Sequence, residues 1–229
     1  MITHHPSDEL LTAFTQGELT ASLSIAVAAH NELCPVCQEK VEKLNAQHAQ
    51  MLFDTDTDTD TETIDDAGND IQESELNWMS MIDDITDDDS QSVLVPIDTK
   101  SVQLSYDNVQ LPRALSNVSL KKWSKLGDVS RARLELEEEP IRSSLLDISP
   151  GGVVPLHTHK GFELTLLLDG SFEDDMGTYH AGDFIWLDKS HTHSPRTTDG
   201  CLCYAVLDDA MEFKEGFSKL FNPIGSYLY

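Results

Sequence analysis

Residues 54–95 carry fifteen acidic residues and no basic residue. Their central run is "DTDTDTDTETIDDAGND", in which aspartate alternates with threonine before further acids follow. The alternation has the period of a β-strand, but both residue types are polar and neighbouring carboxylates repel one another. Because such a run cannot form a packed core, the chain must fold on either side of it. We predict a disordered acidic linker over residues 54–72.

The acidic excess extends over the whole chain and limits its partners. The 229 residues have a formal net charge of −26, which DNA phosphates would repel and a basic protein would attract. We therefore expect no direct nucleic-acid binding. Within the linker, Thr59 and Thr61 stand where a calcium-binding loop needs glycine, which argues against an EF-hand. No segment has an export signal or the roughly 20 apolar residues of a membrane span, so we expect a cytoplasmic protein without a membrane partner.

The sequence before the linker predicts three short helices. The first follows Ser7 and stops at Gly17, the second follows Thr20, and the third begins at Pro35. The third helix has apolar residues at mostly helical spacing, namely Val36, Val41, Leu44 and Met51. Below roughly 70 residues, a helical core of this kind is marginal unless a metal ion or a disulfide supports it.

The stretch "HNELCPVC" supplies candidate ligands for such a metal. His30 ends the second helix, Cys34 and Cys37 begin the third, and the three can converge on one tetrahedral ion. "THHPSD" places His4 or His5 before the first helix as a fourth ligand. A His₂Cys₂ set would bind zinc in a closed structural site whose binding energy stabilises the helices. The alternatives are a Cys-x-x-Cys redox pair, which does not need the histidine, and incidental helix residues.

A further helix is predicted over residues 73–86, at the end of the acidic segment. Its apolar stripe consists of Leu76, Trp78, Met79, Ile82 and Ile85. An isolated helix of this length is marginal in water. It should therefore pack as a fourth core helix, bind a partner, or do both.

From about residue 95 the sequence becomes strand-rich. Short apolar or alternating runs are separated by Gly, Pro and Asp, namely "VQLSY", "ARLELE", "SSLLDI", "FELTLLLDG", "DFIWL" and "CLCYAVL". Their spacing predicts an antiparallel double-sheet sandwich or barrel. The chain is thus expected to be an α plus all-β protein of two domains, a helical module over 1–90 and a β-domain over 95–229.

The β-domain contains a second set of candidate ligands. His157 and His159 point to the same face if they lie on a strand, and Glu163 follows after a short turn. A second His-x-His pair, His191 and His193, comes later. Three imidazoles and a carboxylate suit zinc, iron, manganese or nickel. The alternative for each histidine taken singly is an ordinary core or surface residue.

At these residues the sequence resembles the cupin superfamily. Residues 151–170 match the spaced positions of the first cupin motif, which implies a double-stranded antiparallel β-barrel of the jelly-roll kind. The second motif is looser, and by position in it the resemblance implies His193 rather than His191 as the fourth ligand. The asparagine that usually follows this histidine is absent.

The two ligand sets together resemble the ChrR-type zinc-binding anti-sigma factors, over residues 1–53 and about 95–229. That resemblance implies N-terminal zinc ligands at His5, His30, Cys34 and Cys37. It also implies a cupin site for zinc or another divalent metal at His157, His159, Glu163 and His193. The helix over 73–86 would be the fourth helix of the anti-sigma module. The implied function is to sequester an extracytoplasmic-function sigma factor and to release it on an oxidative signal such as singlet oxygen, without enzyme activity.

Two other interpretations remain at this point. One is a metal-dependent cupin enzyme, a dioxygenase or isomerase, with an accessory helical module. The other is a cupin that binds a sugar or another small molecule as a simple sensor. Within the strand-rich half, Cys201 and Cys203 are a candidate redox pair on one face of a strand, or simply small buried apolar groups.

Overall fold

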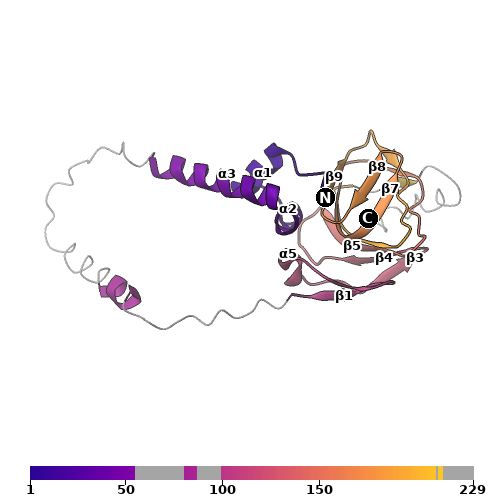
Figure 1. Ribbon diagram of the computed structural model, residues 1–229, viewed down its shortest axis with the longest axis horizontal. Helices are drawn as coiled ribbons and strands as arrows, with labels where there is room; N and C mark the ends of the chain where they lie inside the picture. The colour runs from indigo at the N-terminus through magenta and orange to yellow at the C-terminus, as the bar shows by residue number, and fades with distance from the viewer. Residues whose placement is uncertain (55–79, 87–98, 210, 214–229) are drawn as a thin grey trace. The chain divides into compact units, whose positions relative to one another are not determined.

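The computed structural model describes residues 1–54, 80–86, 99–209 and 211–213 (Figure 1). Residues 1–49 and 98–229 form one compact unit, and residues 50–97 form the other. The N-terminal helices and the strand-rich region therefore belong to the same unit. The predicted boundaries at residues 90 and 95 stay a prediction, and residues 55–72 of the predicted linker lie outside the described part of the chain.

The first helix follows its sequence signals. Helix α1 (Asp8–Thr15) begins after Ser7, whose hydroxyl oxygen accepts a hydrogen bond from the backbone N–H of Leu10 at 3.2 Å. It ends before Gly17, which has a φ of +71°. Because this left-handed conformation is unfavourable for residues with a side chain, glycine is the natural residue for the helix end.

The second and third helices meet at a single residue. Helix α2 (Ala21–Leu33) ends at Cys34, whose N–H donates to the carbonyl of His30. Helix α3 (Pro35–Asp54) starts immediately afterwards, and its Gln38 N–H donates to the carbonyl of Cys34. The junction therefore turns the chain within one residue, between the histidine and the second cysteine of the motif.

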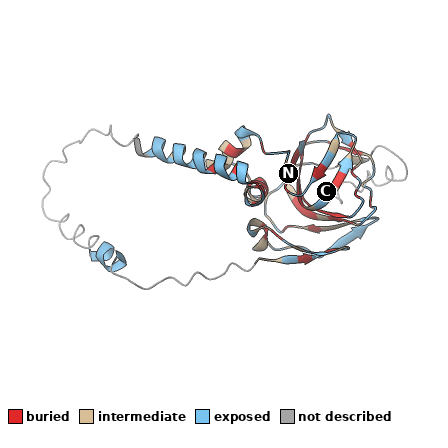
Figure 2. Ribbon diagram, in the orientation of Figure 1, coloured by how far each residue is buried: buried red, intermediate tan, exposed pale blue. Residues whose placement is uncertain are grey.

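The helices do not form a separate core. Buried residues occur in both the helices and the strands (Figure 2). They belong to one apolar cluster, which includes Leu11, Ala26, Val27, Leu145, Leu164 and Tyr204. The hydroxyl of Tyr204 also donates to the carbonyl of Ser22 in α2 at 3.0 Å. Of the four apolar residues predicted along α3, Val41 is buried and Leu44 half-buried, whereas Val36 and Met51 are exposed. Helices α1, α2 and α3 are called the helical head below. The small separate core expected for the head is part of a larger core, because α2 packs on the barrel.

Among the described residues, the barrel strands form two antiparallel sheets in a jelly-roll arrangement, which confirms the predicted fold class. The larger sheet has, in spatial order, β3 (Ser124–Leu126), β4 (Val129–Arg133), β5 (Arg142–Ile148), β11 (Cys201–Leu207), β7 (Glu163–Asp174) and β8 (Gly177–His180), with β9 (Phe184–Leu187) also paired to β7. The smaller sheet has β10 (Thr192–His193), β6 (His157–His159) and β12 (Met211–Phe213). A hairpin of β1 (Ser101–Gln103) and β2 (Asn108–Gln110) and the short helix α5 (Arg113–Ser116) precede them.

Two predicted strands are shorter than expected. The run "ARLELE" continues to residue 137, but β4 ends at Arg133. Leu134 makes an isolated bridge to Leu120 and donates its N–H to the carbonyl of Ser143. The run "VQLSY" continues to residue 106, but β1 ends at Gln103, and the side chain of Asp147 binds Ser105 in the following turn. In both cases a non-local contact ends a run that is locally compatible with a strand.

In the second unit, residues 80–86 are helical, in line with the later half of the helix predicted over 73–86. Residues 73–79, with Leu76, Trp78 and Met79, lie outside the described residues. Among the helices that are described, none combines the length and the apolar character that crossing a membrane requires.

Candidate metal centres

Two groups of side chains in the described residues bring potential metal ligands together, each with its ligand atoms within 4.8 Å of one another. The N-terminal cluster consists of His5, His30, Cys34 and Cys37. The barrel cluster consists of His157, His159, Glu163 and His193. These are the eight residues singled out as metal ligands from the sequence, and their role as ligands stays a prediction.

The N-terminal cluster is built around the junction of α2 and α3. His30 lies in the last turn of α2, Cys34 at the junction and Cys37 in the first turn of α3. His5, which precedes α1, places its Nδ1 atom 3.4 Å from Cys34 Sγ and 3.5 Å from Cys37 Sγ. In a tetrahedral zinc site, bonds of about 2.3 Å to sulfur and about 2.0 Å to nitrogen put N and S roughly 3.5 Å apart. The donor types and their spacing therefore fit zinc.

His30 is oriented for binding by the barrel. Its Nδ1 donates to the carbonyl of Gly182 at 2.8 Å, which leaves Nε2 as the ring nitrogen that can bind a metal. This Nε2 atom is buried and has no hydrogen-bond partner among the described residues. Burial lowers the pKa of His30 to about 4, so the imidazole is neutral at pH 7. A buried, neutral, unpartnered ring nitrogen is what a metal site requires.

Both thiols of this cluster are enclosed by the protein, and the pKa of Cys37 is shifted. Cys34 and Cys37 are both free and buried. Burial, together with the neighbouring Cys34, raises the pKa of Cys37 to about 11. Cys37 is therefore a thiol at neutral pH in the absence of a metal, and it must lose its proton to become a ligand.

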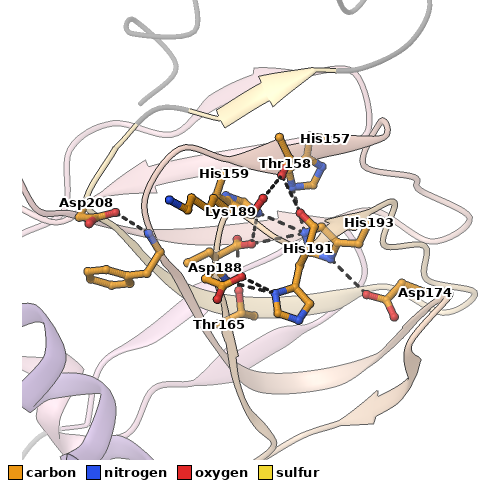
Figure 3. A network of polar contacts seen from close by, with 12 residues as sticks. His157, Thr158, His159, Thr165, Asp174, Asp188, Lys189, His191, His193 and Asp208 are labelled. Carbon is orange, nitrogen blue, oxygen red and sulfur yellow. Dashed lines mark hydrogen bonds and ion pairs between the residues drawn. The ribbon is translucent and has the colours of Figure 1, made fainter.

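The barrel cluster lies where three strands meet (Figure 3). His157 and His159 are on β6, with the one-residue interval that places both on one face. His193 on β10 lies opposite His157 in the strand register, and Glu163 is the first residue of β7. All four residues are between 2% and 6% exposed, so the cluster is enclosed by the barrel.

The three imidazoles meet through their Nε2 atoms. His193 Nε2 lies 3.1 Å from that of His157 and 3.4 Å from that of His159. Glu163 Oε2 is 2.8 Å from His159 Nε2 and 3.4 Å from His193 Nε2. Neighbouring ligands lie about 3.4 Å apart in a tetrahedral site and about 3.0 Å apart in an octahedral one, if metal–nitrogen bonds are about 2.1 Å long. The cluster can thus hold a metal, and its spacing is compatible with more than one geometry.

Contacts around the barrel cluster fix two of its rings. His193 Nδ1 lies 3.1 Å from Asp174 Oδ2, and both side chains are buried (Figure 3). His157 Nδ1 lies 2.8 Å from the carbonyl of Pro155. Such partners turn Nε2 toward the metal and increase the basicity of the ligand. Asp174 was not predicted from the sequence, since "FEDDMG" contains several acids at a hairpin and nothing local distinguishes one of them.

Burial and hydrogen bonds shift the pKa values of the barrel cluster in different directions, lowering those of His157 and Glu163 and raising that of His193. Burial lowers the pKa of His157 to about 4, so this ring is neutral at pH 7. Burial alone would raise the pKa of Glu163, but its hydrogen bonds to His159 and His193 outweigh burial and hold that pKa well below its usual value. The site therefore combines a carboxylate with at least one neutral imidazole.

The two histidines that the sequence left as alternatives lie outside the clusters. His191 is half-buried, and its Nδ1 pairs with Asp188 Oδ1 at 2.9 Å, while its carbonyl accepts a hydrogen bond from Thr158 (Figure 3). His4 instead packs its ring on Tyr179, with the ring centroids 4.9 Å apart. Neither side chain faces the ligand atoms of its neighbouring cluster.

Cys201 and Cys203 are both buried in β11 among apolar residues. A hydrogen bond with Cys201, together with burial, raises the pKa of Cys203 well above its usual value. A protonated, enclosed thiol reacts slowly with oxidants, so these features favour a packing role. The redox role of this pair stays a prediction.

Known proteins resemble both the barrel and the whole chain. Residues 113–210 match the family described as the ChrR cupin-like domain. Over 233 aligned residues, which cover 97% of each protein, the chain is 31% identical to the anti-sigma-E factor ChrR of Cereibacter sphaeroides. The chain belongs to the ChrR family of anti-sigma factors. Because the match spans 97% of the chain, this membership includes the helical head as well as the barrel.

A solved structure supports the same assignment for this ChrR family member. The crystal structure of Rhodobacter sphaeroides SigE in complex with the anti-sigma factor ChrR is similar, with a TM-score of 0.62 and 28% identity. The similarity covers 91% of this chain and 100% of that chain. Family membership makes the chain a regulatory protein, and the alternative of a cupin enzyme is set aside.

Proposed function

We propose that this protein binds an extracytoplasmic-function sigma factor and keeps it inactive. The observation that carries the proposal is the match over 97% of the chain to a relative named as an anti-sigma-E factor. The solved complex of SigE with ChrR supports the same kind of partner. The strong negative charge of this chain suits a partner with basic surfaces, because opposite charges speed association and that effect weakens with salt.

The proposed metal of the N-terminal cluster is zinc, held by His5, His30, Cys34 and Cys37. When bound, the ion would supply a cross-link between the N-terminal segment and the α2–α3 junction. The residues themselves support this role, because their donor atoms are already gathered around one point. Zinc bound in this way would stabilise the helical head through its binding free energy.

The proposed contact surface for the sigma factor includes the helix that ends the acidic segment. Ile82 and Ile85 lie in its described part and are 56% and 71% exposed. Large aliphatic side chains at this exposure gain free energy when a partner covers them. Leu76, Trp78 and Met79, which lie outside the described residues, complete the proposed surface.

Release of the sigma factor is proposed to follow an oxidative signal, such as singlet oxygen, that acts at the barrel cluster. The support is chemical, because three buried imidazoles and a carboxylate lie close enough together to hold zinc or another divalent ion, which would be the proposed occupant. Such a switch must change the relative affinity of two states by roughly 5.5 kcal/mol to move from 1:99 to 99:1.

The test is co-expression with an extracytoplasmic-function sigma factor of the same organism, followed by purification of the complex. Cys34→Ser and His30→Ala should lose the complex. His157→Ala should keep it but lose its response to singlet oxygen. His191→Ala is the matched control for His157→Ala, since this histidine is next to the barrel cluster but outside it. Retention of a full-affinity complex by both N-terminal variants would refute the role of the N-terminal cluster.

A further inference from the structure

The turn between β8 and β9 of the barrel reaches the N-terminal cluster from outside. The carbonyl of Gly182 accepts the hydrogen bond from His30 Nδ1 at 2.8 Å. The ring of Phe184, two residues later, lies edge-on against the His30 ring, with the centroids 5.7 Å apart. Since α2 carries the histidine and the barrel carries its partner, the orientation of this ligand depends on how the two pack together.

The same turn also holds the segment that carries His5. The carboxylate of Asp183 is fully buried, and its Oδ1 accepts hydrogen bonds from the backbone N–H groups of Thr3 at 2.7 Å and His4 at 3.0 Å. The carbonyl of His4 in turn accepts from the N–H of Phe184 at 3.0 Å. His5 is the next residue along the chain, so its position follows from these three contacts.

The surroundings of Asp183 stabilise its ionised carboxylate, which accepts hydrogen bonds from the N-terminal segment. Its other oxygen accepts from the N–H of His180 at 2.8 Å. Burial would raise the pKa of Asp183, but the backbone hydrogen bonds from His180, Thr3 and His4 outweigh burial and hold that pKa below its usual value. A buried carboxylate is stable only while such hydrogen bonds are made, so the N-terminal segment and the turn stabilise each other.

Gly182 leaves room for this segment. It has a φ of +95°, and a Cβ atom at this position would lie 2.3 Å from Ile2 Cδ1. Ile2 also packs on the apolar cluster shared by the head and the barrel. Residues 2–4 therefore lie directly on the turn that faces His30.

We propose that the Gly182–Asp183 turn positions two ligands of the N-terminal metal site. Asp183 holds the segment that carries His5, and the carbonyl of Gly182 orients the ring of His30. The inference rests on the proposed role of the N-terminal cluster as a metal site. It adds that the barrel contributes to metal affinity in the head. Because linkage is reciprocal, metal binding in the head must also tighten the docking of the head on the barrel.

The test is a cobalt(II) titration of the full-length protein. Cobalt bound to thiolates has a charge-transfer absorption, and only the N-terminal cluster of the two contains sulfur, so this band reports that site separately. Asp183→Asn should weaken cobalt binding by about 10-fold to 100-fold, the usual effect of changing an outer-shell partner. Asp188→Asn is the matched control, because it alters an exposed aspartate at the other end of β9 and should leave the affinity unchanged.

A second variant keeps the inference testable if Asp183→Asn does not fold. Deletion of residues 2–4 leaves the barrel sequence intact and removes the segment that Asp183 holds, so it should weaken cobalt binding to a similar degree. Where both changes fold, the double variant should bind cobalt as tightly as the single variant with the lower affinity, because both changes remove the same contacts.

Each result has a definite meaning. Wild-type affinity in Asp183→Asn or in the deletion variant would overturn the positioning role while leaving the metal site in place. Additive losses in the double variant would overturn it as well, because they would show independent effects. No thiolate–cobalt band in the wild-type protein would refute the metal site itself, and the inference with it.

Discussion

The two clusters place similar ligands in different settings. The N-terminal cluster is assembled at a helix junction, includes two thiols, and takes one ligand from an exposed residue before α1. The barrel cluster has only nitrogen and oxygen donors, all buried on strands of the barrel. The first depends on how separate segments pack, whereas the second depends on the register of strands. A site of the first kind is therefore sensitive to how the segments dock, whereas one of the second kind is enclosed within a single barrel.

The largest expected effect is the loss of one thiolate ligand. Structural zinc in small domains binds with roughly 10–16 kcal/mol, so one ligand of four accounts for about 3 kcal/mol, or more than a hundredfold in affinity. Cys34→Ser should therefore purify with one equivalent less zinc per chain, as measured by elemental analysis. Cys201→Ala, which changes a buried cysteine outside both clusters, should keep its metal content. Equal zinc in Cys34→Ser and the wild type would contradict the division into two sites.

Acid should weaken the N-terminal site strongly. The pKa of Cys37 is raised to about 11, so metal binding releases its proton at every pH below that value. Affinity should fall about tenfold per pH unit for this proton, hence about a hundredfold between pH 8 and pH 6. His30, with a pKa of about 4, adds nothing in this window. The thiolate–cobalt band measures the dependence, and a flat profile would mean that the thiol is already ionised without metal.

Asp174→Asn should affect only the barrel cluster. This buried carboxylate faces His193 Nδ1 at 3.1 Å, and its replacement should reduce metal affinity there by about 10-fold to 100-fold. Competition with a zinc chelator should show one weakened site and one unchanged site. A variant that loses both metals would show that the two clusters are not independent.

The smallest expected effect concerns the exposed helix of residues 80–86. Ile85→Ser should change the free energy of unfolding by no more than about 0.5 kcal/mol, because the side chain is 71% exposed. Its affinity for the sigma factor should fall about tenfold if the partner covers this side chain. Calorimetric unfolding and a binding titration give the two numbers. Thr86→Ser, on the same turn, is the control, and an unchanged affinity for Ile85→Ser would remove this helix from the proposed surface.

Much of the fold and of both clusters could be predicted because the signals are local. Ser7 and Gly17 delimit α1 through backbone chemistry that acts within a few residues. His157 and His159 share a face because a strand has a period of two. The two shortened strands show the limit of such reasoning, because Leu134 and Ser105 adopt conformations that depend on residues distant in the chain.

The sequence by itself determined which ligand types occur, their spacing along the chain, and the acidic segment that separates the helical head from the strands. Only the tertiary structure decided that head and barrel share one apolar core, that His5 reaches the thiols, and that Gly182, Asp183 and Asp174 surround the ligands. The physical reason is that these contacts join backbone groups or single acids across long stretches of chain. A backbone carbonyl is present at every residue, so no residue type or periodicity distinguishes the one that a ligand will meet.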